Sequence, residues 1–159
     1  MYLLDSNIMI EAKNRYYAFD ICPGFWTWLE TCHARGRVFS TVAVRDELLK
    51  GKDELTDWTE RRPPGFFINS SGGTAPHLRT LARWASASTH YTSAAKATFL
   101  SSADYYLVAQ ARETGYALVT HEVSSAAKKR VKIPEAATQL GVRILSPYEV
   151  MRTEGARFS

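Results

Sequence analysis

Two acidic residues, Asp5 and Glu122, each stand just beyond a predicted buried strand. Asp5 follows the short apolar run 1–4, and Glu122 follows the apolar segment 116–120. In open α/β sheets, ligands bind outside the carboxyl ends of the strands, so both carboxylates are candidates for a functional site. Asp5 also has a purely structural interpretation, because an aspartate at a helix start can cap the first backbone N–H groups.

Two further acids, Glu47 and Asp104, are predicted near the inward faces of helices. A helix over 42–50 puts Glu47 on the same stripe as its apolar neighbours, and Asp104 lies in the first turn of a helix capped by Ser101 or Ser102. An ionised carboxylate is costly to bury without a partner. Structural alternatives remain open: Glu47 could pair with a basic residue of its own helix, and Asp104 could complement the helix dipole.

The four acids are expected to converge, because right-handed crossovers bring the carboxyl ends of parallel strands to one edge of a sheet. Clustered carboxylates repel and raise each other's pKa values, and a divalent cation relieves that repulsion. Hard oxygen ligands favour Mg²⁺ or Mn²⁺, which can activate a water and orient a phosphodiester for in-line attack. The predicted catalytic and metal-binding residues are therefore Asp5, Glu47, Asp104 and Glu122.

Basic residues are distributed unevenly around these acids. The net charge is +4, and no acidic residue occurs between Glu60 and Asp104. A compact basic group comprises Lys128, Lys129, Arg130 and Lys132. Such a run is the expected footprint of a polyanionic partner, although many charge runs are simply solvated surface. An acidic centre beside basic residues is the arrangement that a metal-dependent nuclease needs.

The overall composition is that of one globular domain over residues 1–159, with 45% hydrophobic and 23% charged residues. No apolar run is long enough for a membrane span, and the amino terminus lacks a signal-peptide pattern, so we expect no membrane association. Cys22 and Cys32 suggest no disulfide framework, and a zinc ligand set at recognisable spacing is missing. Reduced thiols favour a cytoplasmic location.

The predicted elements alternate between strand and helix, which favours an α/β fold with a central, mostly parallel sheet of about four or five short strands flanked by helices in three layers. The segment 66–68 fits either a short strand or a packed loop. Strands are expected at 1–4, 37–40, 116–120 and 142–145, and helices at about 8–15, 25–34, 42–50, 52–62, 76–87, 102–114, 133–140 and from 147 onward.

Four short motifs resemble the PIN domain in order and separation: LDSN at 4–7, RDEL at 45–48, SAD at 102–104 and VTHE at 119–122. The chain is particularly similar to a bacterial PIN-like branch that is labelled as a domain of unknown function. The stretches that carry this likeness are YLLD at 2–5, FDICPGFW at 19–26 and KKRVKIP at 128–134.

This resemblance implies a VapC-like toxin: a Mg²⁺- or Mn²⁺-dependent endoribonuclease, usually dimeric and held inactive by an antitoxin protein. The basic group at 128–132 would then bind the RNA substrate. By motif position the four acids take the acidic places of the family, and Asn7 takes the small polar place beside Asp5. Most PIN domains have Asp where this chain has Glu122, whose extra methylene shifts the carboxylate and favours contact with a metal through water. Thr120 is expected to fix the strand end or a bound water.

Two alternatives belong to other functional classes. A haloacid-dehalogenase-type phosphatase also starts with a strand ending in Asp, but it normally carries a second Asp where this chain has Asn7. A non-catalytic nucleic-acid-binding module on the same fold would gain affinity by losing the four acids, so their presence favours the nuclease. His121 is a further candidate ligand or general base, although a lone histidine is more often structural.

Overall fold

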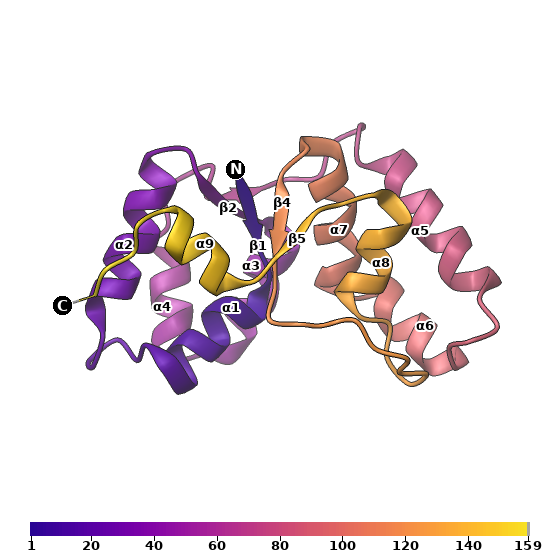
Figure 1. Cartoon of the computed structure of the whole chain (residues 1–159), viewed down its shortest axis with the longest axis horizontal. Coiled ribbons are helices and arrows are strands. Elements are labelled where there is room, and N and C mark those ends of the chain that lie inside the picture. The colour runs from indigo at the N-terminus through magenta and orange to yellow at the C-terminus, as the bar shows by residue number, and fades with distance from the viewer. Residues whose placement is uncertain (159) are drawn as a thin grey trace.

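The computed structural model describes residues 1–158. Within that range one sheet contains five strands in the order β3-β2-β1-β4-β5, and every neighbouring pair is parallel (Figure 1). The strands are β1 (Tyr2–Leu4), β2 (Val38–Thr41), β3 (Phe67–Ile68), β4 (Ala117–Val119) and β5 (Ile144–Leu145). The predicted α/β class with a parallel sheet is confirmed.

Helices connect successive strands and flank the sheet. The α-helices are α1 (Ser6–Glu11), α2 (Pro23–Ala34), α3 (Val42–Leu48), α4 (Glu54–Glu60), α5 (Ala75–Ala87), α6 (Ser93–Leu100), α7 (Ala103–Thr114), α8 (Ile133–Leu140) and α9 (Pro147–Thr153). A π-helical turn, η1 (Ala12–Tyr16), continues α1, and a 3₁₀ turn, η2 (Leu49–Gly51), continues α3.

The sheet is covered on both faces, with α2 and α9 on one side and α7 and α8 on the other (Figure 1). This arrangement explains why β1 and β4 are buried at every position and consist of apolar residues without polar alternation. Leu3 and Leu118 face each other in the register of these two strands, and both are fully buried. Each such leucine stabilises the fold by about 1.5–3 kcal/mol.

Several local expectations need adjustment. The single helix predicted over 8–15 is α1 followed by the π-helical turn, and the helix predicted over 42–50 ends at Leu48 before its 3₁₀ turn. The ambiguous segment 66–68 forms the edge strand β3. Sequence patterns assigned no element to 93–100, which forms α6 with Thr92 as its N-cap.

No helix within residues 1–158 is both long and apolar enough to cross a membrane.

Candidate metal centre

Asp5 lies at the carboxyl end of the central strand. Because Leu4 of β1 is opposite Val119 of β4, Asp5 is brought beside Thr120, and its backbone N–H donates to the Val119 carbonyl at 3.0 Å. The Asp5 carboxylate accepts from the Thr120 hydroxyl at 3.0 Å, from the Ser6 hydroxyl at 3.3 Å and from the Asn7 backbone N–H at 3.4 Å. Asp5 therefore caps α1 and also presents a carboxylate at the sheet edge.

The Asp5 side chain is completely buried. Burial raises its pKa to about 6, and the negative charges of Glu122 and Glu47 add to the rise, while the hydrogen bonds from Thr120 and Asn7 oppose it. An ordinary capping aspartate has a low pKa, because its hydrogen bonds favour the ionised form. At Asp5 the raised pKa therefore shows that burial outweighs these hydrogen bonds, with a smaller contribution from the neighbouring acids.

Asp104 lies in the first turn of α7 and is partly buried. Desolvation raises its pKa to about 7, and the negative charges of Asp5, Glu122 and Glu47 raise it further, with Arg130 acting in the opposite direction. Among the hydrogen bonds between described residues, none involves the Asp104 carboxylate. The charges of Asp5, Glu47 and Glu122 thus act on Asp104, but within residues 1–158 no three acidic side chains lie close enough together to hold a metal ion.

Glu47 departs from its expected position on the inward face of its helix. Its side chain is exposed, whereas its neighbours Val44 and Leu48 are buried, so this glutamate lies at the rim of the buried stripe. Its charge still raises the pKa values of Asp5 and Asp104. The prediction that Glu47 lies on the inward face is wrong, because this glutamate is exposed and acts on Asp5 and Asp104 only through its charge.

Glu122 is engaged by the segment that follows it. Its carboxylate forms an ion pair with Arg130 and accepts from the Ile133 backbone N–H at 2.8 Å, and only 10% of its side chain is exposed. Its own backbone N–H donates to the Thr120 hydroxyl oxygen at 3.1 Å. Glu122 therefore holds the loop between β4 and α8, and Thr120 links it to Asp5.

The donor set fits a hydrated divalent cation better than a site made of protein ligands alone. Within residues 1–158 no group of three or more Asp, Glu, His or Cys side chains lies close enough together to hold a metal ion. Mg²⁺ is usually bound by one or two carboxylates and keeps several waters. Asp5 and Asp104, whose ionised forms are disfavoured by burial and repulsion, are the residues that would hold it, with Glu47 at the rim.

The predicted RNA-binding residues divide into two kinds. Lys128, Lys129 and Arg130 are all exposed, but Arg130 is paired with Glu122. Lys132 is the partly buried N-cap residue of α8. Lys129 and Arg130 line a cavity of about 230 Å³ together with Asp104 and residues of α6. This cavity joins one of the candidate metal ligands to the basic loop.

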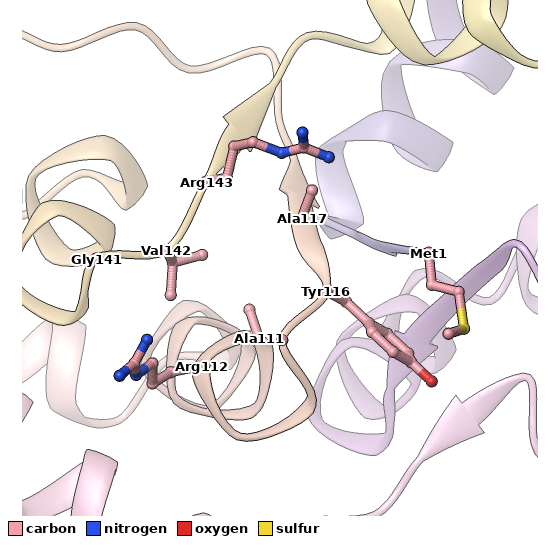
Figure 2. A pocket seen from close by; sticks show the side chains of 9 residues that line it. Met1, Ala111, Arg112, Tyr116, Ala117, Gly141, Val142 and Arg143 are labelled. Carbon is pink, nitrogen blue, oxygen red and sulfur yellow. The ribbon is translucent and has the colours of Figure 1, made fainter.

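A second cavity of about 230 Å³ lies at the amino ends of the strands, opposite the acids (Figure 2). Met1, Tyr116 and Gly141 contribute to its lining, which contains no acidic residue. Figure 2 shows the side chains of Arg112 and Arg143 pointing in different directions, so they do not converge on one ligand. The cavity at the amino ends of the strands therefore lacks the acidic side chains that are found at the carboxyl ends.

Three aromatic rings meet where β4 and β5 end, and no sequence pattern predicted this contact. The His121 ring lies 5.9 Å from the ring of Tyr16 and 6.2 Å from that of Tyr148, measured between centroids, and burial lowers the pKa of His121. Sequence reasoning also missed Ser6, which is buried against Asp5. A small hydroxyl residue directly after a strand-end acid was the available signal for Ser6. No local pattern connects the three rings.

Comparison with known proteins gives a family but no characterised relative. No curated protein and no solved structure matches the chain. A family model described as "Domain of unknown function (DUF4411)" matches residues 2–158. Because this match spans nearly the whole chain, the protein belongs to the DUF4411 family.

Proposed function

We propose that this protein is a metal-dependent endoribonuclease that hydrolyses RNA phosphodiesters with Mg²⁺ or Mn²⁺ held by a PIN-like acidic centre. The observation that carries the proposal is the pair Asp5 and Asp104, whose pKa values are raised to about 6 and about 7. Perturbed pKa values of this kind cluster at functional sites. Two carboxylates that are costly to ionise are better explained by a cation than by a stabilising role in the fold.

Each polar group of the centre has a distinct task in this proposal. The hydroxyl groups of Thr120 and Ser6 hold the Asp5 carboxylate in one orientation. Asp104 has no hydrogen-bond partner among the described residues and is available to a ligand. When bound, the metal would activate a water and neutralise charge that develops on the phosphate. Lys128 and Lys129 lie exposed beside the centre and would attract the RNA backbone.

The wider biological role rests on the resemblance to VapC-like PIN domains. In this proposal the protein is the cytoplasmic toxin of a type II toxin–antitoxin system, acts as a homodimer and is held inactive by a cognate antitoxin. The four interacting acids disfavour a non-catalytic nucleic-acid-binding module, because they would repel a phosphate backbone. A haloacid-dehalogenase-type phosphatase is disfavoured, because Asn7 stands where such an enzyme normally carries its second Asp.

Cleavage of a pool of structured and single-stranded RNA tests the proposal directly. The wild-type protein is expected to cut in Mg²⁺ or Mn²⁺ and not in excess EDTA. Asp5→Asn is expected to abolish cutting, because it removes the charge of a metal ligand and keeps its shape. Asp20→Asn is the matched control, since Asp20 is exposed in the loop before α2. Cutting by Asp5→Asn at the wild-type rate, or cutting in EDTA, would refute the assignment.

A further inference from the structure

The cavity that contains Asp104 lies between three segments, namely α6, the first turn of α7 and the basic loop before α8. Its volume is about 230 Å³. Pockets for drug-sized ligands enclose about 300–1,000 Å³, so this cavity has room for a smaller group, such as one nucleotide. Its lining includes Ala95, Thr98, Phe99, Asp104, Lys129 and Arg130.

The Asp104 cavity has an apolar floor and a polar rim. The floor consists of Ala95, Phe99 and Val131, which are buried, whereas Thr98 and Lys129 at the rim are exposed. The cavity is therefore open to solvent on the side of its hydroxyl and cationic groups. A nucleotide has the same division, because its base has apolar faces and its phosphate is charged.

The basic loop that brings cations to the rim is attached to the segment before α6. The Thr92 N–H donates to the Lys128 carbonyl at 3.0 Å, and Nε2 of His90 lies 3.1 Å from the Ala127 carbonyl oxygen, at hydrogen-bond distance. Among the ion pairs of residues 1–158, none involves Lys129. The loop backbone therefore holds Lys129 at the rim with an ammonium group that no carboxylate neutralises.

The Asp104 cavity also adjoins the candidate metal centre. Asp104 itself lines the cavity, and the positive charge of Arg130 acts on the pKa of Asp104. Arg130 is ion-paired with Glu122, whose charge acts on both Asp5 and Asp104. Cationic and acidic groups therefore meet at Asp104. A phosphodiester held at this carboxylate would have the cavity within reach of its neighbouring nucleotide.

We propose that the Asp104 cavity binds the nucleotide next to the phosphate that is cut, with its base against the apolar floor and its own phosphate on Lys129. This inference rests on the proposed function, because that function places the scissile phosphate at Asp104. A base on the floor has left its helix, so the substrate is unpaired at this nucleotide. An antitoxin side chain is the other candidate occupant, but two cations at the cavity favour a group that carries phosphate.

The test measures binding without cleavage, by nuclear magnetic resonance titration of the isotope-labelled protein in EDTA. The probes are adenosine monophosphate (AMP), adenosine and inorganic phosphate. Ala95→Leu fills the floor of the cavity. Ala97→Leu is its matched control, because Ala97 is exposed and lies about 200° around α6 from Ala95.

A second pair of variants changes charge at the exposed rim, where the fold is not at risk. Thr98→Glu adds a carboxylate that repels phosphate, and Thr98→Gln adds a neutral side chain of the same size. Thermal unfolding verifies that every variant is folded.

AMP is expected to shift the amide resonances of residues 95–104 and 128–131 and to saturate. Ala95→Leu is expected to weaken AMP binding at least about tenfold and Thr98→Glu about fivefold, while both controls stay within about twofold of wild type. Adenosine and inorganic phosphate are each expected to bind at least about tenfold more weakly than AMP, because each uses only the floor or only the rim.

Several results would overturn the inference. They are wild-type affinity of folded Ala95→Leu for AMP, shifts confined to other segments, or equal affinity for AMP and inorganic phosphate. If Ala95→Leu does not fold, equal affinities of Thr98→Glu and Thr98→Gln for AMP would overturn it. Absence of AMP binding would also overturn it and would leave the cavity to an antitoxin side chain.

These results are distinguishable from those of the nuclease assay. If AMP fills the cavity but the wild-type protein cuts no RNA in any metal, the nucleotide site stands and the nuclease is refuted. If the wild-type protein cuts RNA and AMP does not enter the cavity, the nuclease stands and the cavity is not part of its substrate site.

Discussion

Replacement of Asp104 by asparagine is expected to stabilise the metal-free protein at pH 8 and to remove its response to Mg²⁺. The pKa of Asp104 in the folded protein is about 7, above its ordinary value of 3.8, because burial and the neighbouring acids disfavour the ionised form. At pH 8 the folded protein must nevertheless ionise this group. Asparagine keeps the size of the side chain and removes the charge.

The magnitude follows from the rise in pKa. A rise from 3.8 to about 7 corresponds to at most about 4 kcal/mol of destabilisation at pH 8, at about 1.4 kcal/mol for each pKa unit. Water at this partly buried site and adjustment of the neighbouring side chains reduce the effect, and we expect about 2 kcal/mol. For a domain of this size that is a rise in Tm of about 4–8 °C.

The sign of the pH dependence is also defined. The unfolded chain ionises at a lower pH than the folded protein, so the folded state binds more protons between about pH 4 and pH 7. Stability is therefore lost as the pH rises through this window, and the loss is complete above it. The advantage of Asp104→Asn should be largest at pH 8 and should fall to less than about half at pH 5.

Differential scanning fluorimetry in EDTA and in Mg²⁺, at pH 5 and pH 8, measures all of these quantities. Mg²⁺ is expected to raise the Tm of the wild-type protein at pH 8 and to leave that of Asp104→Asn unchanged, because ligand binding to the folded state stabilises it. Asp20→Asn, at an exposed position, should behave as wild type. A lower Tm for Asp104→Asn in EDTA at pH 8, or a gain independent of pH, would refute the explanation by carboxylate repulsion.

Three further substitutions test the surroundings of the centre. Thr120→Val should lower the free energy of unfolding by about 1–3 kcal/mol in urea titrations, because two buried hydrogen bonds are lost, and Thr120→Ser should restore most of it. Arg130→Gln should destabilise by up to about 1 kcal/mol, because it removes the cation of the mostly buried Glu122 carboxylate at a position where solvent screens the ion pair. Lys129→Gln should change stability by less than about 0.5 kcal/mol and reduce the salt dependence of RNA binding by about one charge. Equal urea midpoints for Arg130→Gln and Lys129→Gln would contradict the structural role of Arg130.

Local sequence patterns predicted the features that depend on a single strand or helix. The apolar run before Asp5 is β1, and the helices predicted over 102–114 and 133–140 are each followed by a glycine, Gly115 and Gly141, with positive φ values of 73° and 63°. Glycine adopts this left-handed conformation at low cost, so a helix end can be read from the sequence alone. The acid that follows each strand end, and the acid in the first turn of α7, could likewise be predicted, because each position depends only on where one strand ends or one helix begins.

These local patterns could not predict features that depend on how helices and strands pack together. Glu47 is exposed because of the way α3 is rotated against the sheet, and tertiary packing sets this rotation. A rotation by one residue moves a side chain from the buried stripe to its rim. The pairing of Glu122 with Arg130 depends on the path of an irregular loop. Tyr16 and Tyr148 meet at His121 only because β1, β4 and β5 are neighbours in the sheet.

The central position of the first strand has a consequence for the order of folding. β1 is made first, but one of its two neighbours is β4, and the hydrogen bond between Thr120 and Asp5 joins residues 115 positions apart. Contacts of such long separation form slowly, and a chain folds during synthesis from its amino terminus. The sheet cannot close around β1 until the chain has been made as far as Thr120. Asp5 and Asp104 therefore come together only late in synthesis, and a nascent chain carries the acidic residues without the assembled centre.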